Sequence, residues 1–290
     1  MFYHKKRLQY FTKPEKPDPI YAKQLQELIG GPFGEMSVMM QYLFQGWNCR
    51  GPAKYKDMML DIGTEEIGHV EMLANMIAHL VDKAPADVQE KAALDPIVEG
   101  VLGGMKTEDI IMASMNPKHA VMAGGGALPA DSVGYPWNGN YIVASGNLMA
   151  DFFSNVQAEA QGRLQAVRLY EMSTDAGVKD TLSYMIARDT MHQNQWLAAI
   201  EELKDDGLES LPVPSNFPQS QEKQDASYTF WNLSEGTESQ EGRWAKGPSP
   251  DGKGEFTYLE NPEGQSPMGE APVPNPKLYS TPKQPLTPKQ

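Results

Sequence analysis

The sequence predicts an all-α protein built around a four-helix bundle, and three observations support this fold class. Apolar residues recur at helical spacing in four stretches of the chain, namely residues 19–47, 53–81, 139–173 and 176–203. Short breaks containing glycine, proline or helix-capping residues separate the members of each pair. Of the 23 prolines, 13 lie from residue 205 onward, where they prevent a helix from continuing.

The breaks indicate two antiparallel hairpins. The first stretch is interrupted at the sequence GGP, and the segment GWNCRGP then separates it from the second stretch. Glycine and proline in this segment end one helix and allow the next to begin. In the segment STDAG of the second pair, Ser173, Thr174 or Asp175 can cap the last helix.

Residues 82–138, between the two hairpins, are too many for a turn. They contain a candidate short helix over residues 86–102 and then a glycine-rich loop, MAGGGALPADSVGYPWNG. A ferritin-like bundle has a long crossover at this point. We therefore predict a ferritin-like bundle domain over residues 1–204, in which 82–138 is the crossover and 117–138 forms a channel wall.

Residues 205–290 are predicted to form a proline-rich, mostly irregular C-terminal arm. Composition alone leaves a disordered tail as the alternative. We favour an ordered arm that packs on its own bundle or on a neighbouring subunit, with only the last residues loose. The reason is a set of aromatic side chains too numerous for a solvated tail: Tyr228, Phe230, Trp231, Trp244, Phe256 and Tyr258.

Charge and composition exclude some partners. The net charge is −13, whereas nucleic acids and anionic membranes are bound by clustered Lys and Arg, so neither partner is expected. No apolar run approaches the ~18 residues that a membrane-spanning helix needs. The single cysteine, Cys49, cannot form an intramolecular disulfide, and the first 20 residues lack the apolar stretch of a signal peptide. A cytoplasmic location is expected.

Residues that can bind metal lie at matching depths in the two hairpins. In an antiparallel hairpin, residues equally far from the turn lie at one height, because each helix rises ~1.5 Å per residue. Glu35 and Glu66 are centred on the first turn, and Glu159 and His192 are centred on the second. Each pair lies on the order of 23 Å from its turn, so two hairpins bring all four residues to one level.

Two acid–histidine pairs strengthen this prediction. The spacing of three residues in Glu66–His69 and Asp189–His192 places both members of a pair on one helix face. For a single pair, a solvated acidic face beside a core histidine would be the simpler interpretation. His79 and His119 have no such acidic partners, so we expect them to be core histidines. Oxygen ligands with one imidazole per metal suit manganese or iron. The predicted cluster matches the pattern of di-iron and di-manganese carboxylate proteins, with one Glu replaced by Asp: Glu35, Glu66, His69, Glu159, Asp189 and His192.

Around these residues the sequence resembles the manganese catalases, which are ferritin-like, non-haem enzymes. The similarity is carried by residues 25–77, 116–172 and 187–196, and it extends over about residues 1 to 240. It implies that hydrogen peroxide is the substrate and that two peroxide molecules become water and dioxygen. It also implies two manganese ions per subunit, which cycle between Mn(II)2 and Mn(III)2, and a homohexameric assembly.

The resemblance also implies a role for each ligand. Glu35 and His69 would bind one manganese ion, Glu159 and His192 would bind the other, and Glu66 would bridge the two.

Further residues correspond to positions beside the metals. Tyr42 matches a tyrosine of the family, and Asp189 matches a carboxylate that is a glutamate in some members. Asp189 or Glu35 would carry protons during the reaction. Some members place a basic residue immediately before the ligand of the third helix; Ala158 stands there in this chain, and Arg163 is the nearest replacement.

A weaker, second site follows from the same resemblance, because some members bind calcium through Asp, Asp and Asn-x-Ser-x-Gly. Asp57 and Asp61 are four residues apart, and the segment NLSEG supplies Asn232, Ser234 and Gly236. These oxygen ligands suit one calcium ion per subunit, which would tie the arm to the bundle. Two exposed aspartates and an ordinary turn are the alternative.

Two other functions fit the same pattern. A di-iron oxidase or ferroxidase would have the same fold and ligand types, and metal identity would distinguish it. A structural protein of the spore-coat type, associated with the spore, could retain the fold and act mainly by assembly.

Overall fold

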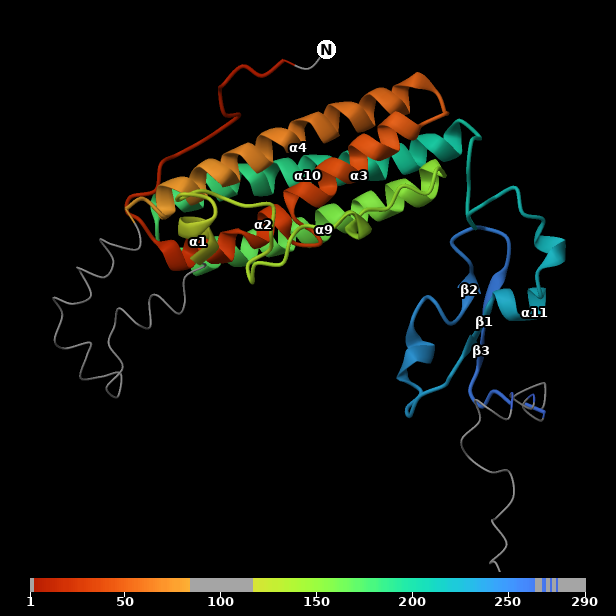
Figure 1. Cartoon of the computed structure of the whole chain (residues 1–290). Helices are drawn as coiled ribbons and strands as arrows, with labels where there is room; N and C mark the ends of the chain where they lie inside the picture. Colours follow the sequence, from red (N-terminus) through yellow and green to blue (C-terminus); the bar gives the residue numbers. More distant parts are fainter. Residues whose placement is uncertain (1–2, 84–116, 264–267, 270–271, 273–274, 276–290) are drawn as a thin grey trace, which may run out of the picture. The chain divides into compact units, whose positions relative to one another are not determined.

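The computed structural model describes residues 3–83, 117–263, 268, 269, 272 and 275, so the predicted helix over 86–102 and the end of the arm lie outside the described residues. The chain divides into two compact units, Met1–Phe217 and Pro218–Gln290. The first unit is helical, and the second contains a small sheet (Figure 1).

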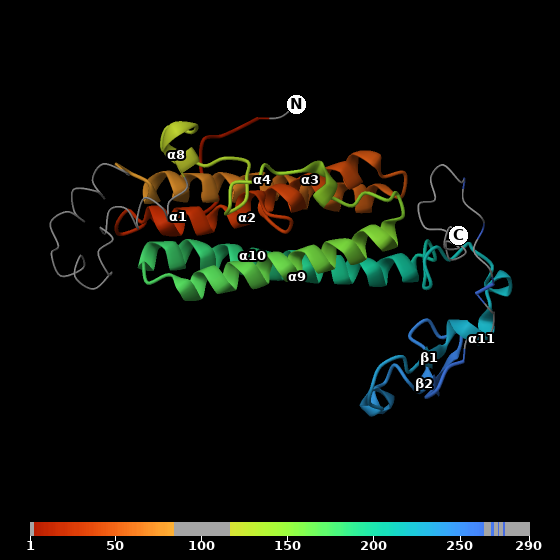
Figure 2. The same cartoon turned by 60° about the horizontal axis from the view of Figure 1, so that its bottom comes forward.

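Four long helices form the first unit and confirm the predicted bundle. Figure 2 shows the long helices over residues 35–48 and 53–80 as one layer and those over residues 148–172 and 176–205 as the other, all running along a common axis. Each layer is an antiparallel hairpin, as the sequence predicts. Among the described residues, two short helices precede the bundle and a third lies in the crossover. In chain order the helices are α1 (Pro19–Leu25), α2 (Glu27–Gly30), α3 (Glu35–Asn48), α4 (Ala53–Leu80), α8 (Pro117–Val121), α9 (Leu148–Met172) and α10 (Ala176–Asp205).

The third long helix begins later than the periodicity predicts. Residues 139–147 were expected to be helical, but they hold a single 3-10 turn, η1 (Gly139–Tyr141), followed by non-helical chain. Gly146 adopts a left-handed conformation with φ of +84°, which a helix cannot contain. The side chain of Asn147 then accepts a hydrogen bond from the Ala150 amide at 3.0 Å and starts α9.

Asp175 is the capping residue of the last helix among the three candidates. Its carboxylate accepts a hydrogen bond from the amide of Val178 at 3.0 Å, which satisfies one of the free amides at the start of α10. The cap fixes where α10 begins and therefore which of its residues face the bundle core.

The apolar core is divided into two clusters by a polar level. On α4, Met59 and Ile62 belong to one cluster, and Met72 and Leu73 belong to the other. Buried polar residues of the same helix lie between these two pairs. The division places the candidate site inside the bundle, with close-packed apolar side chains on both sides along its axis.

The glycine-rich loop of the crossover is fixed to the bundle through α1 and α2. The Gln26 side chain donates to the carbonyls of Leu128 and Ala130, both at 2.6 Å, and accepts from the Leu128 amide at 3.0 Å. Gly30 packs directly against the backbone of Ala130, so a side chain at position 30 would clash with the loop. The loop backbone is thereby seated on the helix that leads into α3.

The second unit contains a three-stranded sheet that the sequence did not indicate. Strand β3 (Glu255–Leu259) lies in the middle, parallel to β1 (Thr229–Trp231) and antiparallel to β2 (Gly247–Pro248). These strands are too short to give a readable alternation of apolar and polar residues. The remaining turns of this unit are η2 (Gln219–Gln221), α11 (Gln224–Ser227) and η3 (Glu238–Glu241).

No helix among the described residues is long and apolar enough to cross a membrane.

Gly30→Ala should destabilise the first unit. A Cβ at this position would lie 2.4 Å from the carbonyl carbon and oxygen of Ala130, so the loop must move. We expect a loss of roughly 1–3 kcal/mol in the free energy of unfolding, measured by chemical denaturation.

Gly139→Ala is the matched control, because a Cβ there would meet no atom within 4 Å. Its effect should stay within about 0.5 kcal/mol. If both variants had the same free energy of unfolding as the unmodified chain, that result would contradict the packing of the loop on α2.

Candidate metal centre

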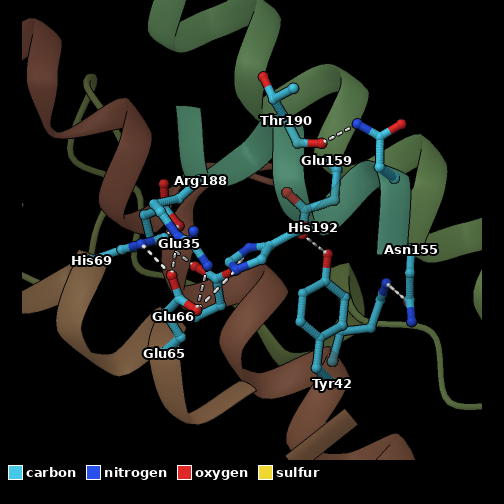
Figure 3. Close-up of polar contacts among 12 residues, drawn as sticks. Glu35, Tyr42, Glu65, Glu66, His69, Asn155, Glu159, Arg188, Thr190 and His192 are labelled. Atoms are coloured by element: carbon cyan, nitrogen blue, oxygen red, sulfur yellow. Dashed lines mark hydrogen bonds and ion pairs between the residues drawn. The ribbon is translucent and has the colours of Figure 1, made fainter. Parts of the chain in front are cut away.

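All six residues of the predicted cluster lie inside the bundle. Glu35 is the first residue of α3, so its position follows from the turn that precedes the helix. The others are buried residues of α4, α9 and α10. Figure 3 shows Glu66, His69, Glu159 and His192 gathered together with Glu35. The exposed fraction of each residue is at most 8%, and the members are Glu35, Glu66, His69, Glu159, Asp189 and His192.

Glu66 lies at the centre of the cluster. One of its carboxylate oxygens is 2.5 Å from Nδ1 of His69, and the other is 2.7 Å from Nδ1 of His192. Glu35 lies 3.5 Å from the same nitrogen of His69, and Glu159 lies 3.8 Å from that of His192. Two groups result, each with ligand atoms within 4.8 Å of one another, and Glu66 belongs to both.

The buried polar atoms at the centre are better arranged to bind cations than to form hydrogen bonds with one another. In the part of the chain that the structure describes, neither oxygen of Glu66 nor any ring nitrogen of His69 or His192 has a hydrogen-bond partner. They lie close together without the geometry of donor and acceptor, as ligands do around a common ion. Buried polar atoms normally have partners, and carboxylate oxygens with imidazole nitrogens are the donor set for manganese or iron.

The centre of the cluster favours positive charge. Burial alone would lower the pKa of His192, but its contacts with Glu65 and Glu66 raise that pKa to about 10. Burial also opposes protonation of His69, yet Glu66 and Glu35 raise its pKa well above the ordinary value. Burial would raise the pKa of Glu66, but the two histidines lower it. Divalent cations would experience the same attraction as these protons.

Burial favours the protonated, uncharged form of the other three carboxylates of the cluster, Glu35, Glu159 and Asp189. Burial is the largest cause, and with the charge of Glu66 it raises the pKa of Glu35 to about 7. Burial and Glu66 raise the pKa of Glu159 well above its ordinary value, and burial with Glu35 and Glu66 does the same for Asp189. Several negative charges can coexist here only if cations compensate them.

The structure places Tyr42 at the site but leaves Arg163 beside it. The Tyr42 hydroxyl donates to Glu159 at 2.6 Å, and its ring packs against Trp196 with centroids 4.9 Å apart. Arg163 instead donates from Nε to the Thr190 hydroxyl at 3.0 Å. No described contact joins Arg163 to the clustered carboxylates or histidines, so a role for it at the site stays a prediction.

Sequence reasoning missed Glu65 and Arg188. The carboxylate of Glu65 lies 3.2 Å from Nε2 of His192 and 3.7 Å from Nε2 of His69. It also accepts hydrogen bonds from Nε and from the guanidinium nitrogen Nη2 of Arg188, at 2.6 and 3.1 Å. Burial would raise the pKa of Glu65, but His192 and Arg188 lower it to about 2. The available signal was spacing, because each residue precedes a cluster histidine by four positions.

The residues predicted to bind calcium belong to different units. Asp57 and Asp61 are exposed on α4. Asn232, Ser234 and Gly236 lie in the second unit, where the Asn232 side chain donates to the Gly236 carbonyl at 3.0 Å. Calcium binding stays a prediction.

The two remaining core-region histidines lie outside the cluster. The ring of His79 stacks on Phe11, with centroids 5.5 Å apart. His119 is buried, and its Nδ1 lies 2.8 Å from the carbonyl of Gly126. Both arrangements are typical of structural histidines.

Comparison with known proteins gives consistent similarities. A family model described as "Manganese containing catalase" matches residues 1–284. The protein YjqC of Bacillus subtilis (strain 168), described as uncharacterized, is 58% identical over 263 residues, which cover 90% of this chain and 91% of that protein. A manganese catalase of the same strain is 56% identical over 259 residues, which cover 89% of this chain and 90% of that protein.

A similar fold is found among solved structures. The crystal structure of KatB, a manganese catalase from Anabaena PCC7120, matches with a TM-score of 0.67 and 26% sequence identity. The match covers 90% of this chain and 100% of that chain.

Metal-free protein, prepared with a chelator, should lose stability as the pH rises from about 6.5 to about 10. A group with a raised pKa in the folded state stabilises fully below its unfolded pKa and ceases to do so above its folded pKa. His192 is such a group, with a pKa raised from 6.5 to about 10. Chemical denaturation at a series of pH values measures this loss.

His192→Gln should reduce the loss, whereas His79→Gln should retain it, because His79 lies outside the cluster. The same pH slope in both variants and in the unmodified chain would contradict the assignment.

Proposed function

The chain belongs to the manganese catalase family, and we propose that its buried cluster carries out the disproportionation of hydrogen peroxide to water and dioxygen. The observation that carries this proposal is the pair of ligand groups that share Glu66. A shared carboxylate is what a dinuclear centre requires, because it holds two cations within reach of one small substrate.

We assign one manganese ion to Glu35 and His69 and the other to Glu159 and His192, with Glu66 as the bridge. The support is geometric, since each oxygen of Glu66 faces Nδ1 of a different histidine. In this assignment, every ligand nitrogen is Nδ1. A manganese pair bound there would give two electrons to one peroxide, which becomes water, and take two electrons from the next, which becomes dioxygen, as it cycles between Mn(II)2 and Mn(III)2.

The protein's own groups then manage protons and orientation. Glu35 can hold or release a proton beside the cluster, since burial and the charge of Glu66 raise its pKa to about 7 while no cation is bound. Asp189 is buried and favours its protonated form, so it can store a proton beside the cluster. The hydrogen bond from Tyr42 fixes Oε1 of Glu159, the oxygen that also lies 3.8 Å from Nδ1 of His192, and so orients this carboxylate in the cluster. The apolar clusters on both sides exclude bulk water.

The two alternative functions are less well supported. A di-iron oxidase or ferroxidase would use the same ligand types, but the family match favours manganese. A structural, spore-coat-type role does not require a complete buried ligand set, which this chain has.

A homohexamer and a cytoplasmic location are further parts of the proposal. The hexamer rests on resemblance to the family, and we propose that the 205–290 arm packs on its own or a neighbouring bundle within it. The mass of the assembly in solution and fractionation of cells and spores would measure the two properties.

Removing the bridge should cost most of the bound metal and, with it, the activity. Protein produced with manganese and iron available should contain about two manganese ions per chain and release oxygen from peroxide in the presence of azide, which blocks haem catalases. Glu66→Ala should lose most of this manganese and the oxygen release, measured by elemental analysis and an oxygen electrode. His79→Ala, outside the cluster, should retain both.

The alternative outcomes separate the functions. Two iron ions without oxygen release would favour the oxidase, and a chain without metal would favour the structural role. A Glu66→Ala variant that kept two manganese ions would refute the bridge.

We propose in addition that Asp57 and Asp61 bind one calcium ion together with Asn232, Ser234 and Gly236. The support is the set of oxygen ligands and the spacing of the two exposed aspartates on α4. Asp61→Asn should remove about one calcium ion per chain in equilibrium dialysis, whereas Asp205→Asn, also exposed on a bundle helix, should not. Equal calcium content in both variants would refute this site.

A further inference from the structure

Both cluster histidines lie between the same two carboxylates, and one ring nitrogen of each histidine faces each carboxylate. Nδ1 of both rings faces Glu66, at 2.5 and 2.7 Å. Nε2 of both rings faces Glu65, at 3.7 Å from His69 and 3.2 Å from His192. Glu65 and Glu66 are consecutive residues of α4, so one short stretch of helix lines both sides of the two rings (Figure 3).

The Nε2 atoms need a hydrogen-bond acceptor. A neutral imidazole that binds metal through Nδ1 carries its proton on Nε2. Both rings are fully buried, so water cannot accept these two N–H groups. In the described part of the chain, neither Nε2 atom makes a hydrogen bond, and Glu65 faces both of them.

Glu65 is the carboxylate that faces both Nε2 atoms. It lies 3.2 Å from His192 and 3.7 Å from His69, and neither contact meets the geometry of a hydrogen bond, so both hydrogen bonds require a small movement of the side chains. Each carboxylate oxygen faces a different ring, which lets one side chain accept from both.

Arg188 holds Glu65 in this position. The guanidinium donates to both carboxylate oxygens, at 2.6 and 3.1 Å, in the forked geometry typical of arginine–carboxylate pairs. Glu65 comes from α4 and Arg188 from α10, so the pair also connects the two hairpins at the level of the cluster. The side chain of Glu65 is 25% exposed and that of Arg188 is 34% exposed, so the pair forms the outer boundary of the site.

We propose that Glu65, fixed by Arg188, is a positioning residue shared by both halves of the dinuclear centre. It accepts the Nε2 protons of His69 and His192 and so holds both rings in the tautomer that leaves Nδ1 free for metal. This inference rests on the proposed manganese site. Because one carboxylate serves both histidines, a change at Glu65 affects both metal positions together.

The test measures how fast manganese leaves the loaded protein. Glu65→Gln keeps the size of the side chain but leaves one acceptor oxygen, and its amide group donates instead. After addition of excess chelator, manganese release should be about 10- to 100-fold faster than in the unmodified chain. The melting temperature of the metal-free form should fall as well, because the ion pair with Arg188 is lost, but that of the loaded form should fall further, so the difference in melting temperature between the loaded and metal-free forms narrows.

Glu71→Gln is the matched control. It removes the same charge from the same helix, where Glu71 contacts the exposed His4, at 2.8 Å. Its release rate should equal that of the unmodified chain. Arg188→Gln keeps the carboxylate but removes the fork, so it should also accelerate release, by less than Glu65→Gln does.

The outcomes separate this inference from the proposed function. If the unmodified chain binds two manganese ions and Glu65→Gln releases them at the rate of Glu71→Gln, the positioning role is overturned. If Glu65→Gln instead lowers the melting temperature of both forms equally, Glu65 is structural and the role is again overturned. If the unmodified chain binds no manganese, the proposed function fails first.

Discussion

The burial of several ionisable side chains at one level of the bundle is the constraint on which the rest of the structure depends. Charges of one sign cannot be buried together unless opposite charges compensate them. The histidines meet part of this need, as the raised pKa of about 10 for His192 shows. Glu35, Glu159 and Asp189, whose pKa values are raised, still require cations before they can all be charged.

The packing of the bundle follows from this constraint. Apolar clusters lie on both sides of the polar level and leave its centre inaccessible to bulk water. A dry environment strengthens every electrostatic interaction within it, including those with bound metal. Because each hairpin supplies proposed ligands from both of its helices, a bound metal pair would join all four helices.

Helix geometry allows α4 to serve both the inner and the outer side of the site. His69 follows Glu66 by three positions and Glu65 by four, and both spacings place side chains on neighbouring parts of one face. Glu66 faces Nδ1, the proposed ligand nitrogen, and Glu65 faces Nε2 on the opposite side of the ring. Glu65 keeps its negative charge because the guanidinium of Arg188 lies beside it, where the site borders solvent.

The sequence by itself determined the bundle and the inner cluster, because both depend on local periodicity and on distance from a turn. Glu35, Glu66, Glu159 and His192 could be brought to one level by counting residues along straight helices, since the rise per residue is constant. The start of α9 was misplaced, because the apolar residues before Asn147 fit a helical period although Gly146 interrupts it.

Only the tertiary structure decided the outer part of the site. A glutamate next to another glutamate on a helix is normally solvated, and Arg188 lies 123 residues away from Glu65 in the chain. Their pairing depends on how the two hairpins face each other, which no local pattern records. The short strands of the second unit depend in the same way on partners distant in sequence.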